Sequence, residues 1–172
     1  KRFYTWTLQS HIDLARAVWL DYCECKMIDT IAREPLWRHL INYRCGTGHS
    51  VSFVGNVHEG PHALNGRNTT LMRPGMVVTD EPGVYETDLV GIRIENELVC
   101  IHKADNQYGT FLGFEPLTFV PIATSPILPG VLDKDELAWL NDYHRQVFAK
   151  LAPHLNAEER VWLAEKCASI GC

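Results

Sequence analysis

Two histidines and two carboxylate motifs gather in one glycine-rich stretch of the chain, residues 45–97. His49 follows the tripeptide Gly-Thr-Gly, and His58 lies within Asn-Val-His-Glu-Gly-Pro. Glu81 belongs to Asp-Glu-Pro-Gly-Val-Tyr, and Glu95 belongs to Gly-Ile-Arg-Ile-Glu-Asn-Glu. Imidazole and carboxylate groups without an organised thiolate set suit Mn²⁺, Co²⁺ or Zn²⁺. The stretch therefore predicts a metal site.

The setting of each side chain separates a ligand from an ordinary polar residue. A lone histidine is more often structural, but two histidines beside two glutamate motifs favour a ligand set. The Pro-Gly after Glu81 predicts a rigid turn that fixes the direction of this carboxylate. Glu95 is expected in mid-strand, where a buried carboxylate is costly unless a metal ion or Arg93 lies beside it. Glu97 shares that strand face and competes with Glu95 for the role.

Helices are expected in the first third of the chain. Apolar residues within 4–20 recur at spacings of three and four, which is typical of an amphipathic helix. A second helix over 26–33 is expected to end before Pro35, because proline disfavours the helical state in the residue before it. Residues 36–43 predict a further short helix packed on the first.

Strands are expected to position the carboxylates. Residues 75–79 and 92–101 are β-prone runs that flank a tight turn and a loop, which indicates an antiparallel pair. Residues 111–127 predict another strand or an ordered loop. Together with the helices, these runs indicate the α/β class.

The end of the chain is expected to be helical. Asp133 and Glu136 have the spacing of a capping box, which predicts a helix that runs to about Leu151. A second helix is expected after Asn156. These two helices would form an appendage that packs on the core or on a second subunit.

Composition excludes several classes of protein. The 172 residues carry a net charge of −5, which gives no basic surface for nucleic acid. No apolar run approaches the roughly 20 residues that span a bilayer. The six cysteines match no zinc ribbon or small disulfide framework, which indicates free thiols in a reducing compartment such as the cytoplasm. The start, Lys-Arg-Phe, is expected to be internal to a longer polypeptide.

The motifs around His49, His58, Glu81 and Glu95 resemble those of the X-prolyl aminopeptidases (aminopeptidase P). These enzymes are dinuclear metallopeptidases of the pita-bread fold. Phe-Leu-Gly-Phe-Glu-Pro-Leu, after residue 110, and the terminal helices resemble the extension of the longer aminopeptidase P type.

The resemblance implies a fold and an activity. Residues 1–127 would be the C-terminal part of a pita-bread catalytic domain, and residues 128–172 a helical C-terminal extension. The parent enzyme would remove the amino-terminal residue of a peptide that has proline in second position. The family resemblance also implies a homodimer.

The resemblance also implies roles for individual residues. His49, Glu81 and Glu95 would be metal ligands, and Glu95 would bridge the two ions. Glu81 would also act as general base toward the attacking water. His58 would contact the substrate or stabilise the tetrahedral intermediate. Two divalent ions are implied, with Mn²⁺ expected and Zn²⁺ or Co²⁺ as alternatives.

Three further residues would surround these ligands. Arg93 would organise the carboxylates, and Tyr85 would form a hydrogen bond near the site. Cys45 stands where many relatives have a histidine that shapes the substrate pocket, so specificity would differ. The family's two aspartate ligands and a further catalytic histidine fall upstream of the region that corresponds to Lys1. With three of five ligands, the 172 residues alone would bind metal weakly and have little activity.

Two alternatives remain open. The first is a prolidase of the same fold, which acts on dipeptides and would not cleave a tripeptide that begins X-Pro. The second is a non-catalytic binding module with a degenerate site, which would bind no pair of metal ions. The presence of His49, Glu81 and Glu95 favours the enzyme.

Overall fold

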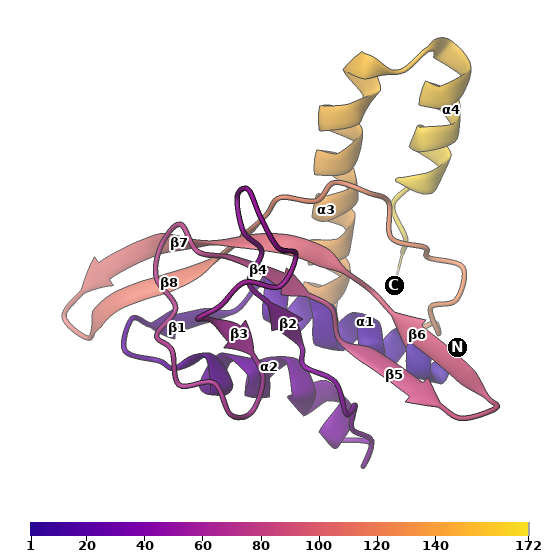
Figure 1. Cartoon of the computed structure of the whole chain (residues 1–172). Helices are drawn as coiled ribbons and strands as arrows, with labels where there is room; N and C mark the ends of the chain where they lie inside the picture. The colour runs from indigo at the N-terminus through magenta and orange to yellow at the C-terminus, as the bar shows by residue number, and fades with distance from the viewer. Residues whose placement is uncertain (172) are drawn as a thin grey trace.

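A computed structural model describes residues 1–171. A curled antiparallel sheet lies over two helices, and two further helices stand above the sheet (Figure 1). The helices are α1 (Arg2–Ala15), α2 (Cys25–Trp37), α3 (Lys134–Leu151) and α4 (Ala157–Lys166), with a short 3₁₀ helix at Ala152–His154. The strands are β1 (Val18–Leu20), β2 (Gly48–His49), β3 (Ala63–Leu64), β4 (Val77–Asp80), β5 (Gly83–Glu86), β6 (Val90–Arg93), β7 (Asn96–Asn106) and β8 (Gly109–Pro116).

The expected first helix is too long. Helix α1 ends at Ala15, and the residues at the end of the predicted helix form strand β1 instead. Strand β1 pairs antiparallel with β8, where the ring of Trp19 packs 4.6 Å from that of Phe114. The predicted helix was wrong here because strand β8, far along the chain, pairs with this segment.

The expectation that Pro35 ends the second helix is also wrong, since α2 continues through it to Trp37. Pro35 and Leu36 are both buried, and this packing offsets the backbone N–H that proline lacks. The expected helix over 36–43 does not form. The chain leaves the helical path at Leu40, whose φ of 57° cannot continue a right-handed helix.

The sheet has the order β1-β8-β7-β4. Strand β4 pairs antiparallel with β7, as predicted, and the last rung of this ladder joins Asp80 to Asn96. The expected strand over 92–101 is interrupted, because β6 turns away and forms a hairpin with β5. Glu95 therefore lies in the two-residue connection between β6 and β7 and not in mid-strand.

Strand β2 brings His49 close to β4. It pairs with β3, and Ser50 forms an isolated bridge with Val78. A Cβ atom added at Gly48 would lie 1.8 Å from the backbone oxygen of Thr79. Only glycine fits at this approach of two backbones.

The terminal helices form as predicted. The Asp133 side chain caps α3 and Glu136 completes the capping box, while Asn156 and Glu159 form a second box at α4. One hydrophobic core lies between the sheet, α1 and α2, and a second joins α3 to α1. The second core contains Leu8, Ile12, Leu140, Tyr143, Val147 and Leu163, among others.

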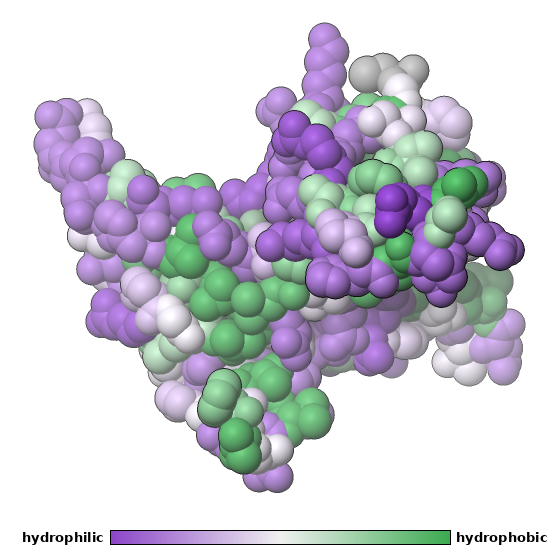
Figure 2. Space-filling model, turned by 90° about the horizontal axis from the view of Figure 1, so that it is seen from above, coloured by the Kyte–Doolittle hydropathy of each residue, from purple (hydrophilic) through white to green (hydrophobic). Residues whose placement is uncertain are grey.

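The surface reflects this arrangement. Seen from above, the tip of the β7–β8 hairpin reaches out as a hydrophilic arm at the left, apart from the terminal helices (Figure 2).

None of the helices over residues 1–171 has the length and apolar character that crossing a membrane requires. Cys23, Cys25, Cys45, Cys100 and Cys167 are free thiols, and Cys172 lies outside the described residues.

Candidate metal centre

His49 and Glu81 meet at one end of the sheet. His49 ends strand β2, and Glu81 directly follows strand β4. The Nε2 atom of His49 lies 3.2 Å from Oε1 of Glu81. Both side chains are largely buried, with 20% and 16% of their surface exposed. The fold thus joins two predicted ligands that are far apart in the sequence.

The Nε2 atom of the His49 imidazole points at this carboxylate. Its Nδ1 atom lies 3.1 Å from the backbone oxygen of Ser50, which can only accept a hydrogen bond. Nδ1 therefore donates this hydrogen bond, and Nε2 faces Glu81. Nε2 and the carboxylate oxygen, 3.2 Å apart, are close enough to share a proton or a metal ion. A backbone carbonyl that fixes the tautomer in this way is common behind metal-ligating histidines.

Thr79 holds the two groups in place. Its hydroxyl donates to Oε1 of Glu81 at 2.8 Å and accepts from the backbone N–H of His49 at 2.9 Å. The backbone N–H of Glu81 donates to the carbonyl of Thr47 at 2.7 Å. The sequence analysis missed Thr79, although it lies two residues before Glu81 and so on the same strand face.

Arg93 occupies the space between the two glutamates. Its guanidinium lies 3.0 Å from Glu95 and 3.6 Å from Glu81. The carboxylate of Glu95, followed by Tyr85, raises the pKa of Arg93 above its usual range. Positive charge is therefore favoured at this point. Within residues 1–171, no three histidine, cysteine or acidic side chains converge closely enough to hold a metal ion.

His58, Tyr85 and Cys45 lie around this centre. The ring centroid of His58 is 4.0 Å from that of His49. The ring of Tyr85 lies over Gly83, where an added Cβ atom would come within 2.8 Å of it. The thiol of Cys45 lies 3.7 Å from the carbonyl of Gly83, and desolvation raises its pKa. A protonated thiol at neutral pH is a poor metal ligand.

Glu97, the competing carboxylate, stands opposite Thr79 in the ladder. It lines a hollow of about 550 Å³ together with Ser50, Glu59 and His62. The contacts described above join His49, Glu81, Arg93 and Glu95 without it.

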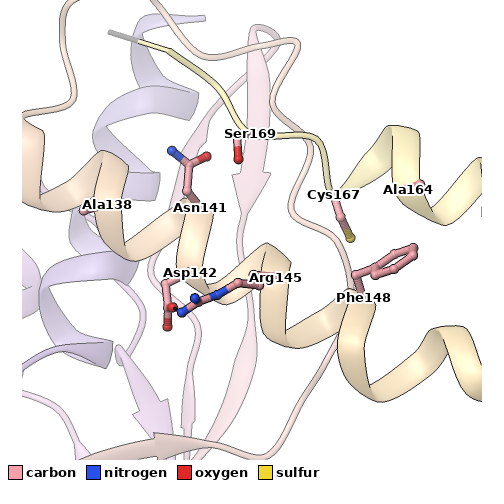
Figure 3. Close-up of a pocket in the computed structure, with 8 residues that line it drawn as sticks. All are labelled: Ala138, Asn141, Asp142, Arg145, Phe148, Ala164, Cys167 and Ser169. Carbon is pink, nitrogen blue, oxygen red and sulfur yellow. Dashed lines mark hydrogen bonds and ion pairs between the residues drawn. The ribbon is translucent and has the colours of Figure 1, made fainter.

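A second hollow, of about 540 Å³, lies between α3 and α4 (Figure 3). Its charged residues Asp142 and Arg145 pair with each other, and Asn141 bonds with the backbone of Ile170. These polar groups are satisfied within the chain, so this hollow offers no rival site.

The residues of this chain therefore supply part of the ligand set that a metal pair needs. His49 and Glu81 supply an imidazole nitrogen and a fixed carboxylate, and Glu95 supplies a second carboxylate, which Arg93 contacts. Oxygen and imidazole donors of this kind suit Mn²⁺, Co²⁺ and Zn²⁺.

Comparison with known protein families matches the chain in two parts. Residues 1–102 match metallopeptidase family M24, and residues 110–170 match the C-terminal region of peptidase M24. The chain is similar to aminopeptidase P1 of Lotus japonicus, with 41% identity over 99% of this chain and 27% of the relative. It is also similar to aminopeptidase P2 of Arabidopsis thaliana, with 42% identity over 95% of this chain and 24% of the relative. The chain thus spans about a quarter of the length of these relatives.

Solved structures agree with these matches. An X-prolyl aminopeptidase of Caenorhabditis elegans, described as a cytosolic enzyme with a di-nuclear active site, superposes with a TM-score of 0.92. The identity is 38%, and the match covers 98% of this chain and 28% of the other. A prolidase of Pyrococcus furiosus matches with a TM-score of 0.58 and 26% identity, over 69% of this chain and 32% of the other.

Proposed function

The chain belongs to metallopeptidase family M24, and we propose that it supplies half of the active site of an X-Pro aminopeptidase. Its fold is the C-terminal half of a pita-bread domain with a helical extension. In this proposal His49, Glu81 and Glu95 are three ligands of a dinuclear centre. The activity is the hydrolysis of the bond between an amino-terminal residue and the proline that follows it.

One observation carries the proposal: Nε2 of His49, whose Nδ1 donates to the carbonyl of Ser50, faces a carboxylate that Thr79 already holds. A proton or a metal ion can lie between these two atoms, and a backbone carbonyl behind the imidazole is common for a metal ligand. The neighbouring position of Arg93 shows that positive charge is also favoured beside Glu95.

The residues of this chain would divide the chemistry. Two divalent ions, with Mn²⁺ expected, would activate the attacking water and polarise the scissile carbonyl when bound. Glu81 would accept the proton of that water and return it to the nitrogen of the leaving proline. His58, beside His49, would stabilise the oxygen that becomes negative in the tetrahedral intermediate.

Three ligands are too few for a dinuclear centre. The family resemblance implies two further aspartates, which the 172 residues do not contain. We therefore expect the isolated chain to bind Mn²⁺ weakly and to leave X-Pro peptides intact. Cleavage of such a peptide by the isolated 172 residues with Mn²⁺ would contradict this division of the site.

The rival activity is that of a prolidase. The chain matches aminopeptidase P relatives along almost its whole length, whereas the Pyrococcus furiosus prolidase covers 69% of it. The C-terminal extension indicates which relatives the chain is close to, but it does not indicate the type of reaction. An X-Pro aminopeptidase of Thermotoga maritima also covers only 70% of this chain. A full-length protein that cleaves an X-Pro tripeptide supports the aminopeptidase, whereas cleavage of X-Pro dipeptides alone would favour the prolidase.

The binding-module alternative is tested by metal titration. Calorimetry on the full-length protein, freed of metal beforehand, should show two bound ions per chain. Binding of no ions would favour a degenerate site.

The cellular location and the oligomeric state are part of the proposal. A cytoplasmic location is supported by the free thiols and by the Caenorhabditis elegans relative, described as cytosolic. A homodimer is supported by exposed apolar side chains on α4, namely Val161 and Trp162. The boundary between residues 127 and 128 stays a prediction. Analytical ultracentrifugation of the full-length protein would detect the dimer.

A further inference from the structure

A buried polar network lies directly behind the candidate metal centre. Its members are His11 of α1, Asp80 of β4, Asn96 of β7 and Tyr143 of α3, and each is at most 4% exposed. None of these side chains takes part in the proposed reaction. Buried polar groups are costly unless each is hydrogen-bonded, so the arrangement needs an explanation.

The network sits on the last rung of the β4–β7 ladder, where Asp80 faces Asn96. Glu81 comes directly after Asp80, and Glu95 directly before Asn96. The side chains of Asp80 and Asn96 point toward His11 of α1. Thr79 lies on the opposite face of β4, because successive side chains alternate along a strand, and Glu81 contacts Thr79 there. Glu81 and Glu95, just beyond the two strands, both contact Arg93. The backbone at this rung therefore links the network to both carboxylates.

His11 joins the two sides of this rung. Its Nδ1 atom lies 3.1 Å from Oδ2 of Asp80, and its Nε2 atom lies 3.3 Å from Nδ2 of Asn96. The amide nitrogen of Asn96 is a donor, so Nε2 accepts and the ring proton is on Nδ1, in ion-pair distance of Asp80 but not aligned for a hydrogen bond. A single imidazole thus connects strand β4 to strand β7 through their side chains.

The C-terminal extension covers this connection. The ring of Trp139 packs edge-on against His11 at 6.1 Å and stacks on Tyr143 at 5.3 Å. The hydroxyl of Tyr143 lies 3.0 Å from the carbonyl of Val120 and 3.4 Å from the side-chain oxygen of Asn96. Tyr143 thus contacts Asn96 from the side of the extension, as His11 does from α1.

We propose that His11 is a positioning residue of the metal centre, which ties Asp80 to Asn96 and thereby sets the spacing of Glu81 and Glu95. This inference rests on the proposed function, since it needs a centre to position. Helix α3 excludes water from the tie, which connects the helical extension to the chemistry of the catalytic domain.

The test uses full-length protein loaded with Co²⁺, whose visible spectrum reports the geometry of its ligands. His11→Leu removes both contacts, and His11→Asn keeps a donor beside Asp80 but is too short to reach Asn96. We expect Co²⁺ affinity to fall by about 10- to 100-fold in both variants, with an altered spectrum, as for other residues behind metal ligands. His11→Gln can keep a donor and an acceptor, and should restore affinity at least in part.

His144 provides a matched control. It is equally buried, lies on α3, and accepts one hydrogen bond from the backbone N–H of Ile122 at 3.0 Å. His144→Gln should lower the unfolding temperature and leave the Co²⁺ spectrum and affinity unchanged. Equal losses of Co²⁺ affinity in the His144 and His11 variants would overturn the proposal, because the effect would then be general.

The remaining outcomes also decide. Wild-type affinity and spectrum in His11→Leu would overturn the inference, even if that variant melts earlier. If His11→Leu does not fold, His11→Asn decides in the same way, because it leaves Asp80 paired. A wild-type protein that cleaves X-Pro peptides and binds two Co²⁺, with variants that match it, contradicts this inference alone. A wild-type protein that binds no Co²⁺ contradicts the proposed function first, and this inference with it.

Discussion

Glu81 and Glu95 occupy equivalent positions, each one residue beyond the rung that joins Asp80 to Asn96, but the chain holds them differently. Glu81 is 16% exposed and is fixed by Thr79, by its own backbone bond to Thr47 and by the ring of His49. Glu95 is 37% exposed, and the contact that orients it is the half-exposed guanidinium of Arg93. One side of the centre is thus preorganised, and the other depends on a neighbouring cation.

The largest expected effect comes from replacing the preorganised carboxylate. Glu81→Gln in the full-length protein should lower kcat on an X-Pro tripeptide by about 100- to 10,000-fold, because the proposed general base is lost together with one proposed metal ligand. Glu95→Gln should instead act mainly by loss of bound metal, measured by elemental analysis. Comparable metal content and comparable kcat in both variants would remove the distinction between the two sides.

Metal binding should order the two sides unequally. Ions at about 100 times their dissociation constant stabilise the folded state by about 2.7 kcal/mol, which thermal unfolding of metal-free and loaded protein measures. Hydrogen exchange should slow more in residues 90–96 than in residues 77–81. Equal protection of the two segments would show that Glu95 is as well fixed as Glu81 without metal.

Thr79 tests what preorganisation contributes. Thr79→Val keeps the shape of the side chain and removes the hydroxyl that donates to Glu81, so metal affinity should fall by about 10- to 100-fold. Thr79→Ser keeps the hydroxyl and is the matched control. A valine variant that binds metal like the serine variant would mean that His49 and Thr47 suffice to orient the carboxylate.

The smallest effect is expected at Arg93. Arg93→Gln should change the free energy of unfolding of the metal-free protein by less than about 1 kcal/mol, because exposed ion pairs contribute little. Chemical denaturation measures this value. A loss well above that limit would show that Arg93 stabilises the fold around Glu95 and does more than face the two carboxylates.

Local signals predicted the extension well. Asp133 and Glu136 cap α3 through contacts within four residues, so the sequence alone determines them. Strand β1 could not be found in this way, because Trp19 becomes a strand residue only through pairing with β8. The break in the predicted strand beside Glu95 was not foreseen for the same reason, since β6 pairs with β5 and not with β4.

The residues of the candidate site also differ in whether a local signal in the sequence indicates them. The texture of the motifs indicated His49 and Glu81 and left Glu95 and Glu97 as competitors, and the family resemblance selected Glu95 and supplied the roles. Thr79 and His11 remained hidden because their importance depends on which atoms they contact after folding. A threonine and a histidine on helical or strand faces are ordinary in any sequence.

Intolerance of substitution at Gly48 would not by itself indicate a catalytic role. Its backbone lies so close to Thr79 that a single methyl group would overlap the opposing carbonyl. A saturation scan that scores survival should therefore find no tolerated substitution at codon 48, as severe a profile as at His49. A ranking of positions by intolerance would place Gly48, which only allows two backbones to approach, beside the proposed metal ligand His49.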